Sequence, residues 1–173
     1  MGTTNRAEFL RGNFSGRARA LRPPWALPES GFVEHCTRCG DCIGACSRRI
    51  LEKGRGGFPQ VNFTWGECTF CGDCVRACAA GAFAAAPQQT ASLVPWFARA
   101  VIDAGCLAMR GIECRSCGDQ CPAGVIRFRL VVGGGAMPEL DDTACTGCGA
   151  CFAVCPVQTI NIRETSPGRE MQL

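Results

Sequence analysis

Cysteine is the residue type in this chain best suited to chemistry, and its spacing is regular. All sixteen cysteines fall into four runs of four. Three runs have the spacing C-x2-C-x2-C-x3-C, and one run stretches its first gap to seven residues. This spacing predicts that the thiolates bind [4Fe-4S] clusters. The runs are Cys36, Cys39, Cys42 and Cys46; Cys68, Cys71, Cys74 and Cys78; Cys106, Cys114, Cys117 and Cys121; and Cys145, Cys148, Cys151 and Cys155.

The short gaps suit the shape of a cubane cluster. Its four irons lie at the corners of a tetrahedron, so a loop that supplies three thiolates must curl around the cluster. Gaps of two residues allow that curl, and small residues let the backbone come close. Gly40, Gly72, Gly118 and Gly149 each follow the second or third cysteine of a run, where a side chain would crowd the turn.

The fourth cysteine of such a run usually serves the other cluster of a pair. We therefore expect four [4Fe-4S] clusters in two pairs, with crossed ligation within each pair. We name the four predicted ligand sets sites I to IV. Site I is Cys36, Cys39, Cys42 and Cys78; site II is Cys68, Cys71, Cys74 and Cys46; site III is Cys106, Cys114, Cys117 and Cys155; and site IV is Cys145, Cys148, Cys151 and Cys121.

Two other uses of cysteine fit the pattern less well. A structural zinc site needs two C-x2-C knuckles separated by a longer stretch, and a third cysteine two residues further on has no place in that plan. A disulfide framework needs an oxidising compartment, and nothing in the N-terminal segment directs the chain to one. The sequence therefore favours iron–sulfur clusters over both a zinc site and a disulfide framework.

The runs divide the chain into two similar modules, each with a cysteine run, a hairpin and a second run. This organisation predicts an α+β fold of two tandem 2[4Fe-4S] ferredoxin-like modules with short helices and small antiparallel β-hairpins. Modules this small bury little apolar surface, so we expect the clusters to hold them together and the apo-protein to be largely unfolded. The expected segments are a basic tail at 1–31, modules at 32–86 and 106–165, a connector at 87–105 and a C-terminal tail at 166–173.

Local patterns place the elements that must position the cysteines. Alternating apolar and polar residues predict strands around 60–64, 126–130 and 160–162. Glycines predict the hairpin turns at 54–57 and 133–135. A short helix is expected at 96–104, directly after Pro95. We also expect a short helix after each cysteine loop.

The N-terminal segment raises the question of export. Residues 5–11 look like a twin-arginine motif with Ala7 in place of the second arginine, and no apolar stretch follows them. No segment has the apolar length of a membrane span. The net charge of +3 counts the cysteines as neutral, and no nucleic-acid motif accompanies it. We therefore expect a cytoplasmic protein without a membrane span and without a nucleic-acid partner.

The whole chain resembles the NapF family of ferredoxin-type proteins of the periplasmic nitrate reductase system. The resemblance rests on RPPW at 22–25, HCTRC at 35–39, the stretched third run and the ending at 145–156. It implies a soluble cytoplasmic protein with four [4Fe-4S] clusters and all sixteen cysteines as ligands. It also implies that the partner is the molybdenum-containing catalytic subunit of periplasmic nitrate reductase, whose maturation the protein assists before export.

Proline after the fourth cysteine distinguishes the two modules. Pro122 and Pro156 follow the third and fourth runs, whereas Ser47 and Ala79 stand there in the first two. Because proline at this position shields the cluster and fixes the chain, we expect the N-terminal pair of clusters to be more exposed and more labile.

Other residues offer weaker hypotheses. His35, beside Cys36, is more often a loop residue facing water than a group that tunes a cluster. Trp25, among prolines and arginines, is either an anchor for a partner or part of a solvated tail. Seven aromatic residues are expected to pack around the clusters: Phe58, Phe63, Phe83, Phe128, Phe152, Trp65 and Trp96.

The sequence predicts a protein that is not an enzyme. It has no nucleophile with a base, no phosphate loop and no nucleotide fingerprint, and every thiol is already assigned. An alternative to the maturation role is an electron carrier between a quinol or ferredoxin pool and a reductase. A subunit of another molybdenum enzyme is a third possibility. Composition does not separate the first two roles, whereas the resemblance and the basic tail favour maturation.

Overall fold

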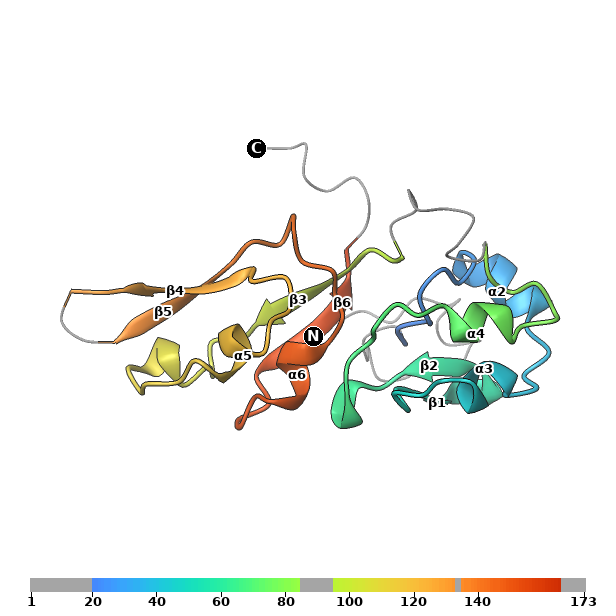
Figure 1. The fold of residues 1–173 in the computed structure, drawn as a ribbon, viewed down its shortest axis with the longest axis horizontal. Coiled ribbons are helices and arrows are strands. Elements are labelled where there is room, and N and C mark those ends of the chain that lie inside the picture. The colour runs from blue at the N-terminus through green and yellow to red at the C-terminus, as the bar shows by residue number, and fades with distance from the viewer. Residues whose placement is uncertain (1–19, 85–94, 133–134, 166–173) are drawn as a thin grey trace, which may run out of the picture.

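The computed structural model describes residues 20–84, 95–132 and 135–165, which form an elongated molecule with one cysteine-rich module at each end (Figure 1). We call residues 20–84 the N-terminal module and residues 95–165 the C-terminal module. Each module contains a short antiparallel hairpin, and a third antiparallel pair of strands lies between the two hairpins (Figure 1). Small hairpins and short helices of this kind are consistent with a ferredoxin-like fold.

The sequence predicts a short helix after each cysteine loop, and the structure has one slightly earlier, inside each run. These helices are four residues long and each contains the third cysteine of its run. They are α3 (Asp41–Gly44), α4 (Asp73–Arg76), α5 (Ser116–Asp119) and α6 (Ala150–Ala153). Three single turns of 3-10 helix accompany them: η1 (Arg55–Gly57), η2 (Phe63–Trp65) and η3 (Ala108–Arg110).

The hairpin of the N-terminal module joins β1 (Leu51–Lys53) to β2 (Pro59–Val61), with Leu51 opposite Val61. The glycine-rich turn falls where the sequence predicts it. The strand ends earlier than expected, because the side chain of Asn62 accepts a hydrogen bond from the Thr64 amide and caps η2. Phe63 therefore lies in the 3-10 turn and not in the strand.

The hairpin of the C-terminal module joins β4 (Ile126–Leu130) to β5 (Ala136–Leu140). The predicted strand at 126–130 is confirmed. Of the glycines expected to turn the chain, only Gly135 lies within the described residues, and its φ is 102°. The last predicted strand is also confirmed, as β6 (Ile160–Glu164).

The expected helix at 96–104 is wrong, because this segment contains the strand β3 (Ala98–Ile102). β3 pairs antiparallel with β6, which sets Ala100 opposite Ile162 and Ile102 opposite Ile160. Ala98 and Ala100 are buried and alternate with half-exposed residues, which is the period of a strand that covers a core on one face. The segment from residue 95 onward thus belongs to the C-terminal module and not to a free connector.

The sequence predicts a basic tail at residues 1–31. For residues 20–31, which the structure describes, this expectation is wrong. Pro23, Pro24 and Trp25 are buried, and the Trp25 amide donates to the Pro95 carbonyl oxygen at 2.6 Å. The helix α2 (Glu29–His35) begins within this segment. Trp25 is therefore part of the core and is not available as an exposed anchor. Residues 1–19 lie outside the described residues.

Arg22 explains why a basic segment can pack against a module. Its guanidinium donates two hydrogen bonds to the Glu29 carboxylate, at 2.9 and 2.7 Å. The same group lies over the rings of Phe32 and Phe58, 5.1 and 5.4 Å from their centroids. A paired arginine that stacks on aromatic rings buries its stem while its charge remains satisfied. A basic composition alone is therefore not enough to predict that a segment is a solvated tail.

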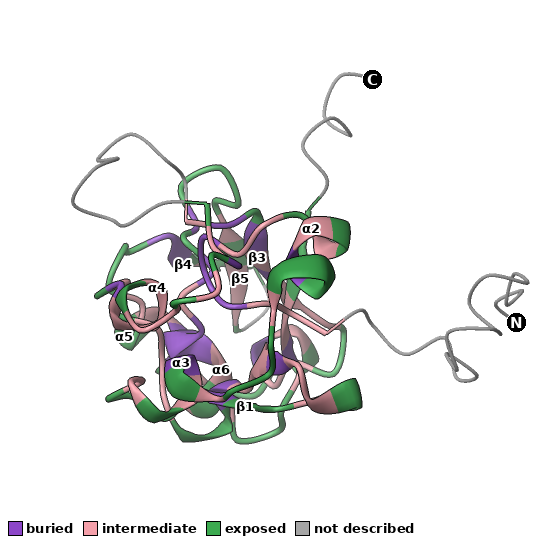
Figure 2. Cartoon of the chain, turned by 90° about the vertical axis from the view of Figure 1, so that its right-hand side faces the viewer, coloured by how far each residue is buried: buried purple, intermediate pink, exposed green. Residues whose placement is uncertain are grey.

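Two cores hold the molecule together, and buried segments gather in its interior (Figure 2). One core lies within the C-terminal module and includes Ile126 and Ile160. The other includes Phe63 of the N-terminal module and Trp96 and Ala98 of the C-terminal module, so it joins the two modules. Trp65 is 81% exposed, and the expectation that it packs around a cluster is wrong.

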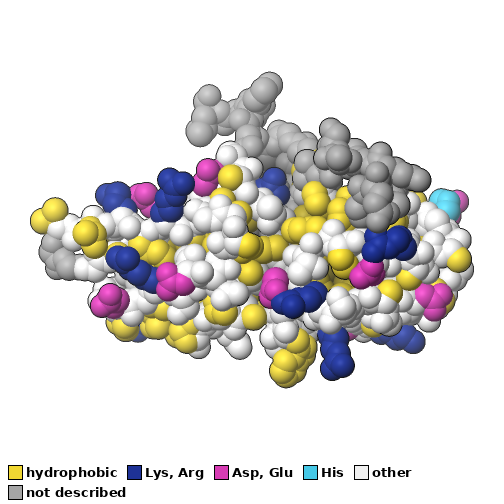
Figure 3. All heavy atoms as spheres, in the orientation of Figure 1, with side chains coloured by type: hydrophobic (Ala, Val, Ile, Leu, Met, Phe, Trp, Pro, Cys, Tyr) yellow, Lys and Arg dark blue, Asp and Glu magenta, His cyan; other side chains and the backbone are white. Residues whose placement is uncertain are grey.

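None of the helices in the described ranges is long and apolar enough to cross a membrane. On the face drawn in Figure 3, basic and acidic side chains are interspersed. The formal charge of the apo chain is small, at +3.

Candidate iron–sulfur cluster sites

Two cavities are lined by the crossed quartets that the sequence predicts. The site I cavity is lined by Cys36, Cys39 and Cys42 of the first run together with Cys78 of the second. The site IV cavity is lined by Cys145, Cys148 and Cys151 of the fourth run together with Cys121 of the third. In both cavities, three cysteines come from one loop and the fourth comes from the partner run. This arrangement fits a [4Fe-4S] cluster with crossed ligation.

The thiols of site II also lie together. Burial is the main cause that raises the pKa of Cys68, and the charges of Cys71 and Cys46 raise it further. The pKa of Cys74 is raised by burial first and then by Cys68, by Cys42 of site I and by Cys71. Thiols of the first two runs therefore share one neighbourhood, and the crossed ligation of site II stays a prediction.

Site III is the least complete of the four. Cys106 and Cys114 are close enough to Cys117 to raise its pKa. The sulfur of Cys155 accepts from the backbone amide of Thr159 at 3.4 Å, and the Thr159 hydroxyl lies 3.6 Å from the same sulfur. The ligation of site III by Cys155 stays a prediction.

The backbone conformation repeats from run to run. The residue three positions after the fourth cysteine has a left-handed φ in all four runs: Arg49, Gly81, Gly124 and Gln158, with φ of 53°, 70°, 62° and 50°. The glycine after the second cysteine of the first, second and fourth runs is also left-handed and caps the following helix. These glycines are Gly40, Gly72 and Gly149. Such conformations favour glycine because it has no Cβ.

The stretched third run departs from this pattern. Its long first gap contains the 3-10 turn η3 and the left-handed Gly111. Arg115, which follows the second cysteine, has φ −130° and replaces the left-handed glycine of the other runs. Gly118 is small for another reason: a Cβ there would lie 2.8 Å from the Phe128 ring and 3.0 Å from the Ile126 carbonyl oxygen. The predicted crowding at Gly118 thus comes from the hairpin β4–β5.

Backbone N–H groups donate to two of the cysteine sulfurs. The Phe70 amide donates to Cys68 Sγ at 3.4 Å, and the Thr159 amide donates to Cys155 Sγ at the same distance. Burial alone would raise the pKa of Cys155, but the hydrogen bonds from Thr159 and from neighbouring amides lower it below its ordinary value. Hydrogen bonds of this kind stabilise sulfur that carries negative charge, as a cluster ligand does. No sequence pattern identified Phe70 or Thr159 as partners of sulfur.

Other cysteines are costly to ionise without metal. Burial is the main cause, and it raises the pKa of Cys42 and Cys117 to about 11 and that of Cys68, Cys74 and Cys151 to about 12. Nearby thiolates raise these values further. Ligands must be deprotonated to bind a metal, so cluster binding releases protons and supplies the positive charge that such crowded thiolates need.

Among the residues that the structure describes, no three His, Cys, Asp or Glu side chains converge closely enough to hold a single metal ion. A cubane cluster is larger than one ion and sets its thiolates farther apart. The lined cavities, the repeated loop conformation and the N–H donors to sulfur all fit that larger group.

The aromatic residues predicted near the clusters do not all lie at a cavity. Phe83 lines the site I cavity, together with Phe32, which the sequence did not single out. Phe63 and Phe152 pack against each other between the modules, with ring centroids 6.3 Å apart. His35 is the last residue of α2, is exposed and lies 2.9 Å from the Gly31 carbonyl oxygen through Nδ1. It is thus a helix-end residue at the surface.

Comparison with known proteins agrees with this geometry. The model of the 4Fe-4S dicluster domain matches residues 35–82 and 110–159, one match in each module. Ferredoxin-type protein NapF of Haemophilus influenzae is 47% identical over 169 residues, which cover 92% of this chain and 93% of that protein. The chain belongs to the NapF family of ferredoxin-type proteins. Within the family, the NapF protein of Escherichia coli K12 is 42% identical, with 90% of this chain and 92% of that protein covered.

The likeness extends beyond the NapF family. Methylamine utilization ferredoxin-type protein MauM of Methylorubrum extorquens is 33% identical over 177 residues, which cover 90% of this chain and 76% of that protein. Membership of the NapF family and two dicluster domains make this chain a ferredoxin-type protein that binds 4Fe-4S clusters.

Proposed function

We propose that this protein carries four [4Fe-4S] clusters and assists maturation of the molybdenum-containing catalytic subunit of periplasmic nitrate reductase. In this role it binds that subunit in the cytoplasm, before export, and supports cluster assembly or supplies electrons to it. It is not itself an enzyme. The observation that carries the proposal is the similarity to NapF proteins over nearly the full length of both chains.

The sixteen cysteines are the proposed ligands, in the crossed sets of sites I to IV. The cavities lined by the site I and site IV quartets support this assignment. When bound, [4Fe-4S] clusters supply one-electron redox chemistry. The chain itself contributes the thiolates, the N–H donors to sulfur and the apolar surroundings that limit access of water.

A second function is an electron carrier that passes electrons from a quinol or ferredoxin pool to a reductase. The similarity to a ferredoxin-type protein named for methylamine utilization supports this alternative, because it indicates that related chains serve more than one redox system. Both functions need the same clusters, so the cluster sites do not decide between them.

Nitrate reductase activity in cells that lack this protein separates the two functions. The activity is measured once with an artificial reductant that feeds the catalytic subunit directly, and once by the natural quinol route. Loss of both activities supports the maturation role, because the catalytic subunit itself is then badly made. Loss of the quinol-driven activity alone overturns it and supports an electron carrier.

A matched pair of complementing variants shows whether the clusters are needed. Cys39→Ala removes a proposed site I ligand, whereas Val33→Ala changes an exposed residue of α2 that does not line the site I cavity. We expect Val33→Ala to restore activity and Cys39→Ala to restore much less. Equal restoration would contradict a role for site I in maturation.

A further inference from the structure

Two cysteines of different modules are joined directly through the backbone. The amide N–H of Cys68 donates to the carbonyl oxygen of Cys148 at 2.8 Å. Cys68 belongs to site II of the N-terminal module, and Cys148 belongs to site IV of the C-terminal module. This contact places one site of each module side by side.

Aromatic packing holds this junction together. Phe63 is 5% exposed, and its ring centroid lies 6.0 Å from that of Trp96 and 6.3 Å from that of Phe152. The Phe63 ring also covers Gly149, the residue after Cys148, so closely that a Cβ there would lie 2.1 Å from it. A side chain of the N-terminal module therefore rests on the loop that forms site IV.

Within each module, the two sites are joined by their short helices. In the N-terminal module, α3 packs against α4, and these helices carry Cys42 of site I and Cys74 of site II. In the C-terminal module, α5 packs against α6, and these carry Cys117 of site III and Cys151 of site IV. Figure 1 shows α3 beside α4 at one end of the molecule and α5 beside α6 toward the other.

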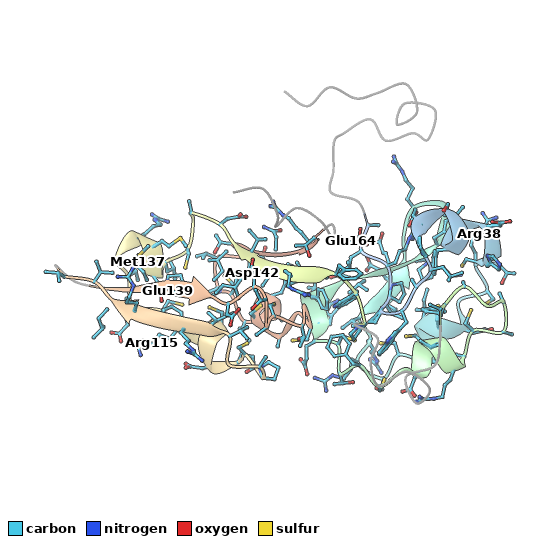
Figure 4. The ribbon with its side chains drawn as sticks, turned by 90° about the horizontal axis from the view of Figure 1, so that it is seen from above. Arg38, Arg115, Met137, Glu139, Asp142 and Glu164 are labelled. Atoms are coloured by element: carbon cyan, nitrogen blue, oxygen red, sulfur yellow. The ribbon has the colours of Figure 1, made fainter. Side chains whose placement is uncertain are left out.

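The remaining two sites face opposite ends. Arg38 lines the site I cavity. Residues Met137 and Glu139 lie on β5, which packs against η3 in the stretched gap of the third run, next to Cys106 and Cys114 of site III. Figure 4 shows Arg38 at one end of the molecule and Met137 and Glu139 toward the other.

We propose that the four sites form one unbranched series in the order I, II, IV, III, with the Cys68–Cys148 contact as the junction between the modules. The inference rests on the proposed occupancy of all four sites by [4Fe-4S] clusters. Sites II and IV are then interior neighbours, and sites I and III are the two ends. An electron that crosses the junction oxidises one cluster by as much as it reduces the other, so the exchange needs no further reactant.

Two double variants of the full chain test this order. Cys39→Ala with Cys114→Ala removes one ligand each from sites I and III and keeps the interior pair. Cys71→Ala with Cys148→Ala removes one ligand each from sites II and IV and keeps the end pair. Each variant is reduced with dithionite and studied by electron paramagnetic resonance. We expect broadened, rapidly relaxing signals from the interior pair and the resolved signals of isolated clusters from the end pair.

Equal spectra from the two variants, or coupling in the end pair alone, would overturn the proposed order. Iron content is measured on the same samples, because a wild-type protein with less iron than four clusters require overturns the proposed occupancy and not the order. It also identifies a double variant that has lost its retained clusters. If a double variant has lost its retained clusters, the order is tested instead with a second pair of variants, in which every cysteine ligand is kept.

Phe63→Ala loosens the junction, and Phe58→Ala is the matched control. Phe58 packs against Phe32 within the N-terminal module, with ring centroids 6.5 Å apart, away from the junction. In fully reduced protein with wild-type iron content, we expect Phe63→Ala to lower the microwave power at half-saturation severalfold, because relaxation through the neighbouring cluster weakens. Phe58→Ala should leave it unchanged. Equal shifts in the two variants would overturn the junction.

Discussion

The two modules carry equal numbers of cysteines in nearly the same spacing, yet they expose them differently. The N-terminal module has two exposed cysteines, Cys39 and Cys71, and one buried cysteine. The C-terminal module has three buried cysteines and none that is exposed. Equal ligand spacing therefore does not give equal shielding from solvent.

The difference comes from the elements that support each module. Aromatic residues and the segment before the first run cover the N-terminal module, where Phe32 is 0% exposed against Phe58 and Phe83. Paired strands of five residues and an aliphatic core that includes Ile126 and Ile160 cover the C-terminal module. Ligand spacing thus determines which thiolates meet, and the supporting elements determine how much water reaches them.

Removal of iron should have the largest effect on the amide protection of the two modules. With a chelator under anaerobic conditions, we expect both modules to lose most of their amide protection, because their small cores leave little to hold the loops without metal. Far-UV circular dichroism and amide hydrogen exchange measure the loss. The control is the same protein after its clusters are rebuilt. If one module keeps its amide protection without iron, folding depends on metal only in the other module.

Truncation of one core residue in each module should have the next largest effect. Phe32→Ala removes a fully buried ring, and Ile126→Ala shortens a side chain that is 5% exposed. Such changes cost about 3–5 and about 2–5 kcal/mol, respectively. We expect each variant to lower the amide protection of its own module, measured by hydrogen exchange on the holo-protein.

Val33→Ala is the control for Phe32→Ala, because Val33 lies next to it on α2 and is 42% exposed. Val33→Ala should change the amide protection of the N-terminal module little. Equal loss in both modules after Phe32→Ala would mean that the core shared by Phe63 and Trp96 makes them one cooperative unit.

The pattern of cysteines predicted the cluster chemistry and the order of run, hairpin and run, because thiolate spacing is a local property of a loop. It did not predict strand β3, whose antiparallel partner β6 lies far along the chain. Alanine-rich residues 98–102 are compatible with a helix until that partner is present. Tertiary pairing therefore overrides local preference.

Two further features could not be read from the sequence. Arg22 gives its segment a basic character, and only the position of Glu29 and two phenyl rings shows that the segment is packed. The contact between Cys68 and Cys148 joins residues of different runs, and no spacing rule connects them. The ligands of a site are thus easier to predict than the way in which two sites meet.

Exposure predicts the order in which the clusters are lost. Because Cys39 and Cys71 are exposed, we expect a chelator to take iron from sites I and II severalfold faster than from sites III and IV. The two phases are followed by the loss of visible absorption. Electron paramagnetic resonance of samples stopped after the first phase identifies the remaining sites. A single phase, or earlier loss from the C-terminal module, would contradict the greater lability of the N-terminal pair.

The turn after the fourth cysteine offers a smaller, stabilising test. The Arg49 amide donates to the Cys46 carbonyl oxygen at 3.0 Å, which makes Ser47 the second residue of a four-residue turn, a position that favours proline. The fourth run has the same turn with Pro156 at that position. Ser47→Pro should stabilise the N-terminal module by about 0.4–1 kcal/mol and slow the first phase of iron release. Pro156→Ala should have the opposite effect in the C-terminal module, and faster release after Ser47→Pro would show that proline does not protect the N-terminal pair.

The smallest expected effect distinguishes two equivalent loops by charge. In the N-terminal module, Asn62 Oδ1 accepts from the amide and hydroxyl of Thr64, at 2.9 and 2.6 Å. In the C-terminal module, Asp141 Oδ1 accepts from the amide and hydroxyl of Thr143, at 3.1 and 2.6 Å. The hydrogen bond from the Thr143 side chain, followed by that from the Ala144 amide, holds the pKa of Asp141 below its ordinary value.

A lowered carboxylate pKa stabilises the loop fully above the ordinary pKa, and this contribution is lost as pH falls through the lowered value. Between about pH 8 and about pH 6, the difference in amide protection between wild type and Asp141→Asn should therefore stay constant and small. Hydrogen exchange of residues 141–145 measures this difference, with the Asn62 loop, whose capping side chain carries no charge, as an internal reference. A difference that grows or shrinks across this neutral range would show that another group controls the loop. A constant difference would show that the charge at Asp141 gives the C-terminal module a slightly firmer loop without making it sensitive to physiological pH.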